Sequence, residues 1–391
     1  MSETQKHTKP NVPNLRFPGF EGEWERKRIG SIGSFFSGGT PSSSKKEYYG
    51  GVIPFIRSGE IHSDKTELFL TEEGYDNSSA KMVEKGDILL ALYGANSGDI
   101  SISQIQGAIN QAILCIRTDV APVFFKSVWE KHVQRVLNTY LQGGQGNLSA
   151  EIVKGIPLFI PSPREQKKIA GLFSLIEERI AVQNKIIERY QSLIRAIIIH
   201  SQTVAQKSVS LRDILTEKSE LNHNGYDICS VSVSKGVVNQ VEYLGRSFAA
   251  KETGHYHVVA EGDIVYTKSP TGDFPYGIIK QSWLKHPVAV SPLYGVYRPA
   301  TYTIGYYLHF YFCSPQNTQN YLRKLIQKGA KNTINITNQH FLDNKILLPE
   351  DKLISKAVSA IKLISRRISI EENYLNQLVS QKAFFLSQLL R

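Results

Sequence analysis

The 391-residue sequence has few cysteines and no long apolar run. Its three cysteines, Cys115, Cys229 and Cys313, are far apart, which excludes a disulfide framework and a cysteine-rich metal cluster. No segment reaches the apolar length that spans a bilayer, and the polar N-terminus lacks the apolar region of a signal peptide. We therefore expect a cytoplasmic protein without membrane association.

Motifs of common nucleotide-using enzymes are also missing. The sequence has no GxxxxGK(S/T) phosphate loop, and it lacks the Asn-Pro-Pro-Tyr or Asp-Pro-Pro-Tyr run that positions an extruded adenine in amino-methyltransferases. His255 and His257 have no third ligand at a suitable spacing, so no metal site is expected. Asp87 and Asp263 occupy equivalent Gly-Asp-Ile runs, and we expect each to brace a turn before a strand. The sequence therefore predicts no active site.

The charge of the chain is unbalanced towards basic residues. The formal net charge is +11 at pH 7, which favours a polyanionic partner, nucleic acid before membrane. A chain of this length can also form two domains, each with its own core.

One long helical pattern occurs twice. From Arg164 to His200, and again from Asp351 to Arg391, apolar residues follow the three-and-four spacing of a helix that packs along another helix. The copies align with Gln183 opposite Glu371, where polar residues interrupt both stripes, and we call this correspondence of positions the repeat alignment. Two ordinary core helices are the alternative, and the spacing leaves the direction of pairing open. The expected interface residues are Ile169, Phe173, Ile176, Ile180, Ile187, Ile194, Ile361, Ile364, Ile368, Leu375, Leu378 and Phe385.

The segments before the two long helices repeat each other as well. Gly59 corresponds to Gly236, and the separation between matching positions then drifts slowly and in order along the chain, as insertions in a duplicated unit make it do. We expect strands at 51–56, 87–93 and 108–116, and helices at 123–140 and around 304–327. The predicted fold is α+β/α/β, with two similar globular domains, two long helices and an approximate internal twofold repeat. The expected divisions are a flexible N-terminal segment at 1–14, domains at 15–163 and 204–349, and long helices at 164–203 and 350–391.

Each domain carries polar residues where nucleic acid can be contacted. Loops rich in Gly, Asn or Lys at 143–149 and 328–337 precede the long helices, and further polar residues follow predicted strands. Backbone N–H groups and such side chains meet phosphates or base edges, although a helix stop followed by a surface turn is the alternative. The candidate DNA-binding residues are Arg57, Ser58, Lys81, Tyr93, Asn96, Gln145, Asn147, Lys235, Lys268, Ser269, Lys328, Lys331, Asn332 and Asn335.

Two stretches resemble the specificity subunits of Type I restriction-modification systems. They are the opening run 15–24 and the junction 156–170, which contains Glu165-Gln166 and Ile169-Ala170. The second junction, 346–354, lacks the Glu-Gln pair. The resemblance implies two target-recognition domains separated by two long antiparallel helices. Each domain would read one half of a split target in double-stranded DNA, and the helices would set the spacer and dock two methyltransferase subunits.

The resemblance also implies that the chain is non-catalytic and carries no cofactor. S-adenosylmethionine, ATP and Mg²⁺ would belong to the methyltransferase subunits and to the restriction/translocase subunits. Two other interpretations stay open at this point: a coiled-coil adaptor with two ligand-binding domains that binds no DNA, and a catalytic subunit such as a nuclease.

Overall fold

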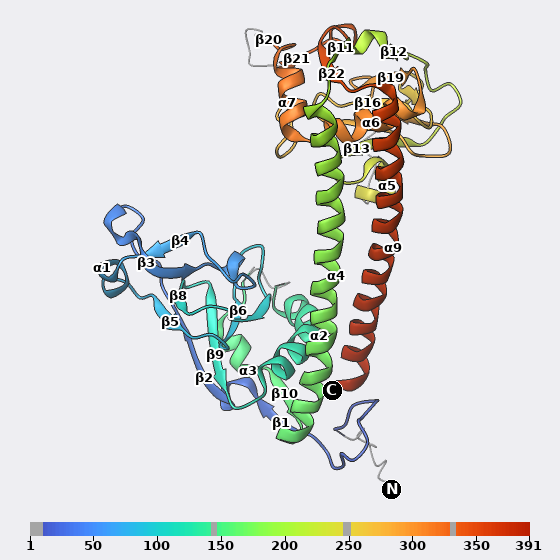
Figure 1. Ribbon diagram of the computed structural model, residues 1–391. Helices are drawn as coiled ribbons and strands as arrows, with labels where there is room; N and C mark the ends of the chain where they lie inside the picture. Colours follow the sequence, from blue (N-terminus) through green and yellow to red (C-terminus); the bar gives the residue numbers. More distant parts are fainter. Residues whose placement is uncertain (1–10, 142–146, 245–251, 329–333) are drawn as a thin grey trace. The chain divides into compact units, whose positions relative to one another are not determined.

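The computed structural model describes residues 11–141, 147–244, 252–328 and 334–391. The chain forms two compact units: unit 1 comprises Met1–Asn184 and Asn373–Arg391, and unit 2 comprises Lys185–Glu372. The long helices are α4 (Pro163–Thr203) and α9 (Asp351–Leu389). Each unit therefore joins one sheet-rich domain to one part of each long helix (Figure 1).

Unit 1 contains two four-stranded sheets and a two-stranded ribbon. One sheet has the order β2-β9-β6-β7, and the other has the order β4-β3-β8-β5 with β3 and β8 parallel. The ribbon pairs β1 with β10, which leads into α4. The strands are β1 (Glu25–Arg28), β2 (Gly33–Ser37), β3 (Tyr49–Ile56), β4 (Leu68–Leu70), β5 (Lys81–Val83), β6 (Ile88–Ala91), β7 (Ile100–Ile102), β8 (Gly107–Ile109), β9 (Ile113–Thr118) and β10 (Pro157–Ile160). The α-helices of this domain are α1 (Glu72–Asp76), α2 (Pro122–Leu141) and α3 (Ala150–Gly155).

Unit 2 repeats this topology strand for strand. Its sheets have the orders β12-β19-β16-β17 and β14-β13-β18-β15, again with one parallel pair, β13 and β18, and its ribbon pairs β11 with β22. The strands are β11 (Lys207–Ser210), β12 (Leu215–Glu217), β13 (Ile228–Ser232), β14 (Gly236–Asn239), β15 (His257–Val259), β16 (Ile264–Tyr266), β17 (Ile279–Gln281), β18 (Val288–Val290), β19 (Gly295–Pro299) and β22 (Lys345–Leu348). A hairpin of β20 (Gln327–Lys328) and β21 (Ile334–Asn335) accompanies α5 (Gln240–Leu244), α6 (Tyr302–Phe312), α7 (Pro315–Arg323) and α8 (Asn338–Phe341). The predicted internal repeat is confirmed.

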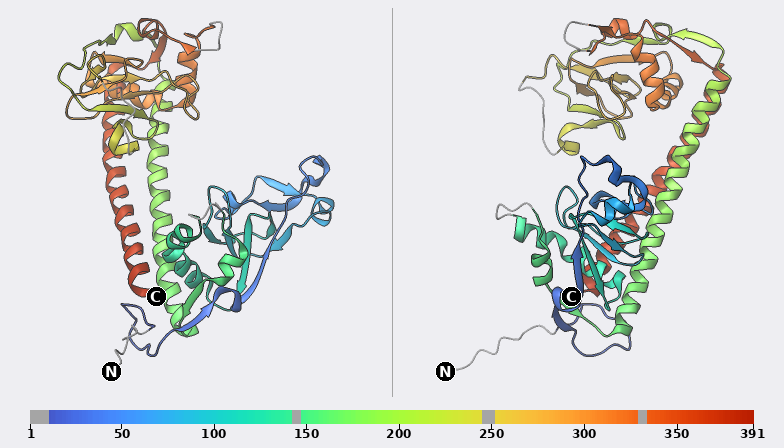
Figure 2. Two further views of the ribbon diagram at one scale, coloured as in Figure 1. Left: turned by 180° about the vertical axis from the view of Figure 1, so that it is seen from behind. Right: turned by 90° about the vertical axis from the view of Figure 1, so that its left-hand side faces the viewer.

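The long helices pair antiparallel. In unit 1 the first part of α4 packs with the last part of α9, where Glu177 of α4 bonds Lys382 of α9. In unit 2 the last part of α4 packs with the first part of α9, where Ile194 and Ile361 share a core cluster. Figures 1 and 2 show the two helices side by side.

The interface residues expected from the apolar stripes lie inside or beside these contacts. In the unit 1 helices, Ile169, Phe173 and Ile176 are buried, and Ile180, Leu375 and Phe385 are half-buried. Ile187, Ile194, Ile361 and Leu378 are also buried, and Ile364 and Ile368 pack against the unit 2 core. Gln183 and Glu371, which correspond in the repeat alignment, are both buried, so each helix carries a polar side chain inside its apolar stripe. A buried polar residue of this kind fixes the register of paired helices.

Two predicted elements are wrong, because the structure divides each of them into two. The apolar run 108–116 is two strands, β8 and β9, in different sheets, because the side chain and backbone of Asn110 accept hydrogen bonds from Ala112 and Ile113 and turn the chain. The run 304–327 contains two α-helices instead of one. Ser314 caps the N-terminus of α7. Pro315, at the first position of α7, has no backbone N–H with which to continue the hydrogen bonds of α6.

No helix in the described part of the chain combines the length and apolar character that a membrane span needs.

Candidate nucleic-acid interface

The two Gly-Asp-Ile runs hold their turns by the same contacts. Asp87 accepts a hydrogen bond from the backbone of Glu84 at 2.9 Å and pairs with Arg117 of β9. Asp263 accepts from the backbone of Ala260 at 2.8 Å and pairs with Arg298 of β19. Burial alone would raise the pKa of Asp87, but the Arg117 guanidinium and the Glu84 N–H lower it. Both aspartates brace turns before strands, as predicted from the sequence.

Replacing Asp263 with Asn is expected to lower the free energy of unfolding of unit 2 by about 1.5 kcal/mol. The Asp263 side chain is fully buried, and the amide oxygen can still accept from Ala260, but the charge that faces Arg298 is lost. Urea unfolding measures the change. Asp263→Leu removes the turn acceptor as well and should cost more; equal losses for the two variants would show that the hydrogen bond to the turn contributes nothing.

The two stretches that carry the family resemblance meet in unit 1. Arg16 makes two 2.8 Å hydrogen bonds to Glu165, whose side chain is almost fully buried. The neighbouring Gln166 donates to the Pro161 carbonyl and accepts from the backbone of Ala121. The Glu-Gln pair therefore ties the N-terminal segment and the start of α2 to the start of α4.

In unit 1 the described DNA-binding candidates gather at one edge of the second sheet. Arg57 and Ser58 follow β3, and Lys81 begins β5, which pairs with β8 so that its start lies beside the ends of β3 and β8. The amide of Asn96, in the loop after β6, lies 3.5 Å from the Ser58 carbonyl. Because β3 and β8 are parallel and β5 is antiparallel to β8, polar groups from separate segments lie at a common edge of the sheet.

The guanidinium of Arg57 is already paired with two carboxylates at this edge. Its guanidinium pairs with Glu60 at 3.0 Å and with Glu67 at 2.7 Å, and these hydrogen bonds raise its pKa. Burial alone would raise the pKa of Glu60, but the Arg57 guanidinium and backbone N–H groups lower it to about 2. Ser58, Lys81 and Asn96 are therefore better placed than Arg57 to contact DNA.

A buried hydrogen bond fixes the loop between β6 and β7 to α2. The indole N–H of Trp129 in α2 donates to the Gly98 carbonyl at 2.7 Å, in the buried core. Gly98 has φ +86°, and a Cβ there would lie 2.7 Å from the Val133 side chain, so only glycine fits. The half-buried Tyr93 lies in this loop, and burial raises the pKa of its hydroxyl. A fixed loop suits a reading surface because little conformational entropy is lost on binding.

Asn147 lies beside the same loop. The backbone N–H of the next residue, Leu148, donates to the Leu92 carbonyl at 2.9 Å, and the Asn147 side chain is exposed. Gln145, from the same Gly-rich segment, lies outside the described residues.

Unit 2 places its candidates at the equivalent edge. Lys235 lies in the turn after β13 and lines a cavity of roughly 480 Å³ together with Asp227 and His286. Lys268 and Ser269 follow β16, and partial burial lowers the pKa of Lys268. Lys331 and Asn332 lie outside the described residues; Lys328 and Asn335 lie in the hairpin of β20 and β21, but their side chains are also outside the description.

Sequence reasoning missed several side chains around these edges. In unit 1, His62 bonds Asp99 at 2.9 Å, and Gln104 donates to the His62 carbonyl, beside the loop that carries Asn96. In unit 2, His257 begins β15, which corresponds to the place of Lys81 in β5. Alignment of the two repeats strand by strand is the signal that could have found His257.

Among the described residues, no group of three or more His, Cys, Asp or Glu side chains converges as metal ligands do.

Comparison with known proteins finds relatives of part of the chain. Residues 21–190 match the Type I restriction modification DNA specificity domain. The chain is 29% identical over 184 residues to the Type I restriction enzyme MjaIX specificity subunit of Methanocaldococcus jannaschii, covering 43% of this chain and 41% of that protein. It is 24% identical over 195 residues to the HindI specificity subunit of Haemophilus influenzae, covering 46% and 41%. Each match therefore spans less than half the length of the relative.

Solved structures extend the likeness of fold to the whole chain. The S subunit of a Type I restriction-modification system from M. genitalium aligns with a TM-score of 0.58 at 14% identity, over 97% of this chain and 99% of that one. A chain from a study of the assembly and conformational transition of the Type I R-M system aligns with a TM-score of 0.51 at 12% identity, over 96% and 99%. Residues 21–190 therefore match a Type I restriction modification DNA specificity domain, and nearly the whole chain has the fold of a solved Type I S subunit.

Proposed function

We propose that this chain is the DNA-reading, non-catalytic subunit of a Type I restriction-modification complex. Each unit reads one half of a bipartite target in double-stranded DNA, and the paired helices set the number of unread base pairs between the halves. The observation that carries the proposal is the duplication: two domains of identical strand order present polar residues at the same sheet edge. Two linked readers of one duplex gain affinity from each other when their spacing suits the DNA.

The outer faces of the helices support docking of two copies of one partner. Leu175 and Val182 of α4 are 61% and 50% exposed, and Leu363 and Ile370 of α9 are 66% and 57% exposed. These pairs correspond in the repeat alignment, so both copies of the repeat present leucine followed two helical turns later by a β-branched residue. Exposed apolar stripes of this kind are typical of protein interfaces. We assign them to two methyltransferase subunits, which bind S-adenosylmethionine.

The remaining chemistry falls to other subunits in this proposal. Restriction/translocase subunits supply ATP hydrolysis with Mg²⁺ and DNA cleavage, and the chain described here carries no cofactor. The match of residues 21–190 to a DNA specificity domain favours DNA over the adaptor function. A salt titration of binding to random duplex separates the two, since phosphate contacts make affinity fall steeply as salt rises.

Genome-wide mapping of N6-methyladenine tests the proposal directly. Cells that express this chain with a Type I methyltransferase subunit are expected to methylate one new two-part motif with a fixed gap. The methyltransferase subunit alone is the control. Methylation without a bipartite motif, from a complex shown to assemble, would contradict the proposal.

Replacing Asn96 with Ala is expected to weaken recognition in one half-site only. Asn is suited to paired hydrogen bonds with adenine, and loss of such a pair costs about 1–3 kcal/mol, roughly a 5-fold to 160-fold effect at the affected position. Binding to a set of single-base variants of the target measures it. Uniform weakening across all variants would instead place Asn96 on a phosphate.

A further inference from the structure

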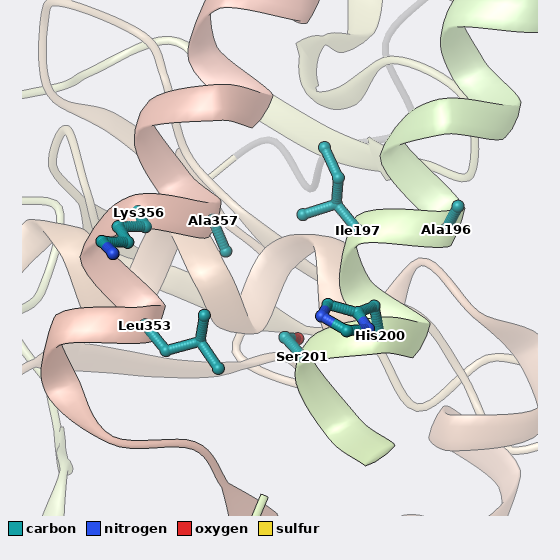
Figure 3. A pocket seen from close by; sticks show the side chains of 7 residues that line it. All are labelled: Ala196, Ile197, His200, Ser201, Leu353, Lys356 and Ala357. Carbon is teal, nitrogen blue, oxygen red and sulfur yellow. The ribbon is translucent and has the colours of Figure 1, made fainter. Parts of the chain in front are cut away.

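Unit 2 has an apolar groove where the end of α4 meets the start of α9. Its volume is roughly 390 Å³, and it is lined by Ala196, Ile197, His200, Ser201, Leu353, Lys356 and Ala357. Figure 3 shows Ile197 and Leu353 pointing into the space between the two helices, with Ser201 below Ile197 and beside His200. Almost all of the lining surface is apolar, although the groove lies at the surface of the unit and three of its members, Ala196, His200 and Lys356, are exposed.

In unit 1, the equivalent positions are contacted by the chain's own residues 15–17. The backbone N–H of Leu15 donates to the Gln388 carbonyl at 2.9 Å, and Arg16 bonds Glu165. Phe17 follows, with the Lys168 ammonium 5.6 Å from the centre of its ring. Residues 15–17, which we call the arm, therefore cross the end of α9 and the start of α4.

The repeat alignment matches the two grooves position by position. Gln388, Glu165 and Lys168, which hold the arm, correspond to His200, Leu353 and Lys356. The lining of the unit 2 groove is also smaller, because Ala196 and Ala357 stand where unit 1 has Phe384 and Ile169. Unit 2 thus has residues at the same positions, but two of them have smaller side chains.

The chain gives unit 2 no arm of its own. In unit 1 residues 11–24 precede β1, whereas in unit 2 only residues 204–206 connect the end of α4 to the start of β11. A three-residue link spans at most about 10 Å and is used entirely in reaching the strand. Within the described residues, the arm is bound in unit 1 and unit 2 has no counterpart of it, which favours an occupant from another molecule.

We propose that this groove binds a short segment of a protein partner that mimics the arm. Its first three residues correspond to Leu15, Arg16 and Phe17, which contact Gln388, Glu165 and Lys168 in unit 1. We infer an aromatic third residue, which Lys356 would cover as Lys168 covers Phe17. The second residue is apolar instead of arginine, because Leu353 replaces the carboxylate of Glu165.

Two labelled peptides test the proposal by fluorescence anisotropy on the full chain, without DNA or other subunits. One is the arm sequence Asn-Leu-Arg-Phe-Pro-Gly-Phe, residues 14–20, and the other replaces its arginine with leucine. The leucine peptide is expected to bind saturably and about tenfold more tightly than the arginine peptide, since an unpaired guanidinium against Leu353 is desolvated without compensation. Because the assay contains no DNA, its outcome is independent of whether the chain reads a bipartite target.

Matched variants locate the binding. Leu353→Glu restores in unit 2 the carboxylate that unit 1 has at Glu165, and Leu353 is half-buried, so the variant should fold as the parent does. It is expected to reverse the preference, so that the arginine peptide binds at least tenfold more tightly than the leucine peptide, whereas Val379→Ala, at an exposed position of α9 in unit 1, should leave both affinities unchanged. Absence of saturable binding up to about 1 mM, or an unchanged preference in Leu353→Glu, would overturn the proposal. A concentration-dependent dimer that Leu353→Glu abolishes would also overturn it, by assigning the groove to a second copy of the chain.

Discussion

Replacing Lys382 with Met is expected to lower the free energy of unfolding of unit 1 by about 3 kcal/mol and to leave unit 2 unchanged. The Lys382 ammonium of α9 lies 2.7 Å from Glu130 of α2 and 2.8 Å from Glu177 of α4. Lys126 of α2 pairs with the same two carboxylates and completes a neutral cluster of four charges. Methionine would leave two largely buried carboxylates with one cation, and a buried charge without a partner is strongly destabilising.

The loss should depend on pH in a defined direction. Burial would raise the pKa of Glu177, but the hydrogen bonds from Lys126 and Lys382 lower it below its ordinary value. A carboxyl group with a lowered folded-state pKa stabilises the fold above its unfolded pKa, about 4.3, and this contribution is lost as pH falls through the folded value. The parent and the Lys382→Met variant should therefore converge in stability under acidic conditions.

Hydrogen exchange of the α2 backbone amides, compared with those of α6 in unit 2, measures whether the effect is confined to unit 1. Lys352→Met replaces an exposed lysine of α9 and serves as the control for loss of one positive charge. The double variant Lys382→Met/Glu177→Leu should recover most of the lost stability, because Lys126 and Glu130 then remain as a neutral pair 3.1 Å apart. If it stays as unstable as the single variant, lost packing and not an unpaired charge is the cause.

The large features of the fold were predictable because they repeat. The apolar spacing of α4 and α9 and the repeat alignment are visible without coordinates, and the burial of Gln183 and Glu371 at matching places follows from the same alignment. The turns at Asp87 and Asp263 were likewise predictable, since an aspartate can accept hydrogen bonds from its own turn. Local chemistry and periodicity are enough for these features.

Contacts between distant segments were not predictable from one sequence. Nothing in the helical patterns of α2 and α6 shows that Lys126 meets Glu177 or that Tyr306 bonds Ser365. The turn at Asn110 was missed because the apolar run continues through it. The candidate DNA-binding residues stay a prediction, but the structure sorts them: Asn96 lies against Ser58, whereas Arg57 is already bound by Glu60 and Glu67.

Inserting one heptad into α4 and one into α9 is expected to widen the unread gap of the DNA target without changing either half-site. Seven residues lengthen a helix by about 10 Å, and base pairs are about 3.4 Å apart, so the gap should grow by up to about three base pairs. The insertions belong after Asn184 and after Glu372, where the two compact units divide. Seven residues turn a helix about 20° short of two full turns, so the apolar stripes of the two helices keep facing each other.

A heptad inserted into α4 alone is the matched control. It shifts the stripe of α4 against that of α9, so that Gln183 and Glu371 no longer stand at equivalent places, and a misplaced polar side chain in an apolar seam destabilises the pairing. We expect loss of methylation from this variant and a longer gap from the double insertion, both measured by mapping N6-methyladenine. An unchanged gap in an active double-insertion variant would show that the helices do not set the spacing. The gap would then have to come from the reading surfaces of the two units, and exchange of one unit between related chains would change it together with a half-site.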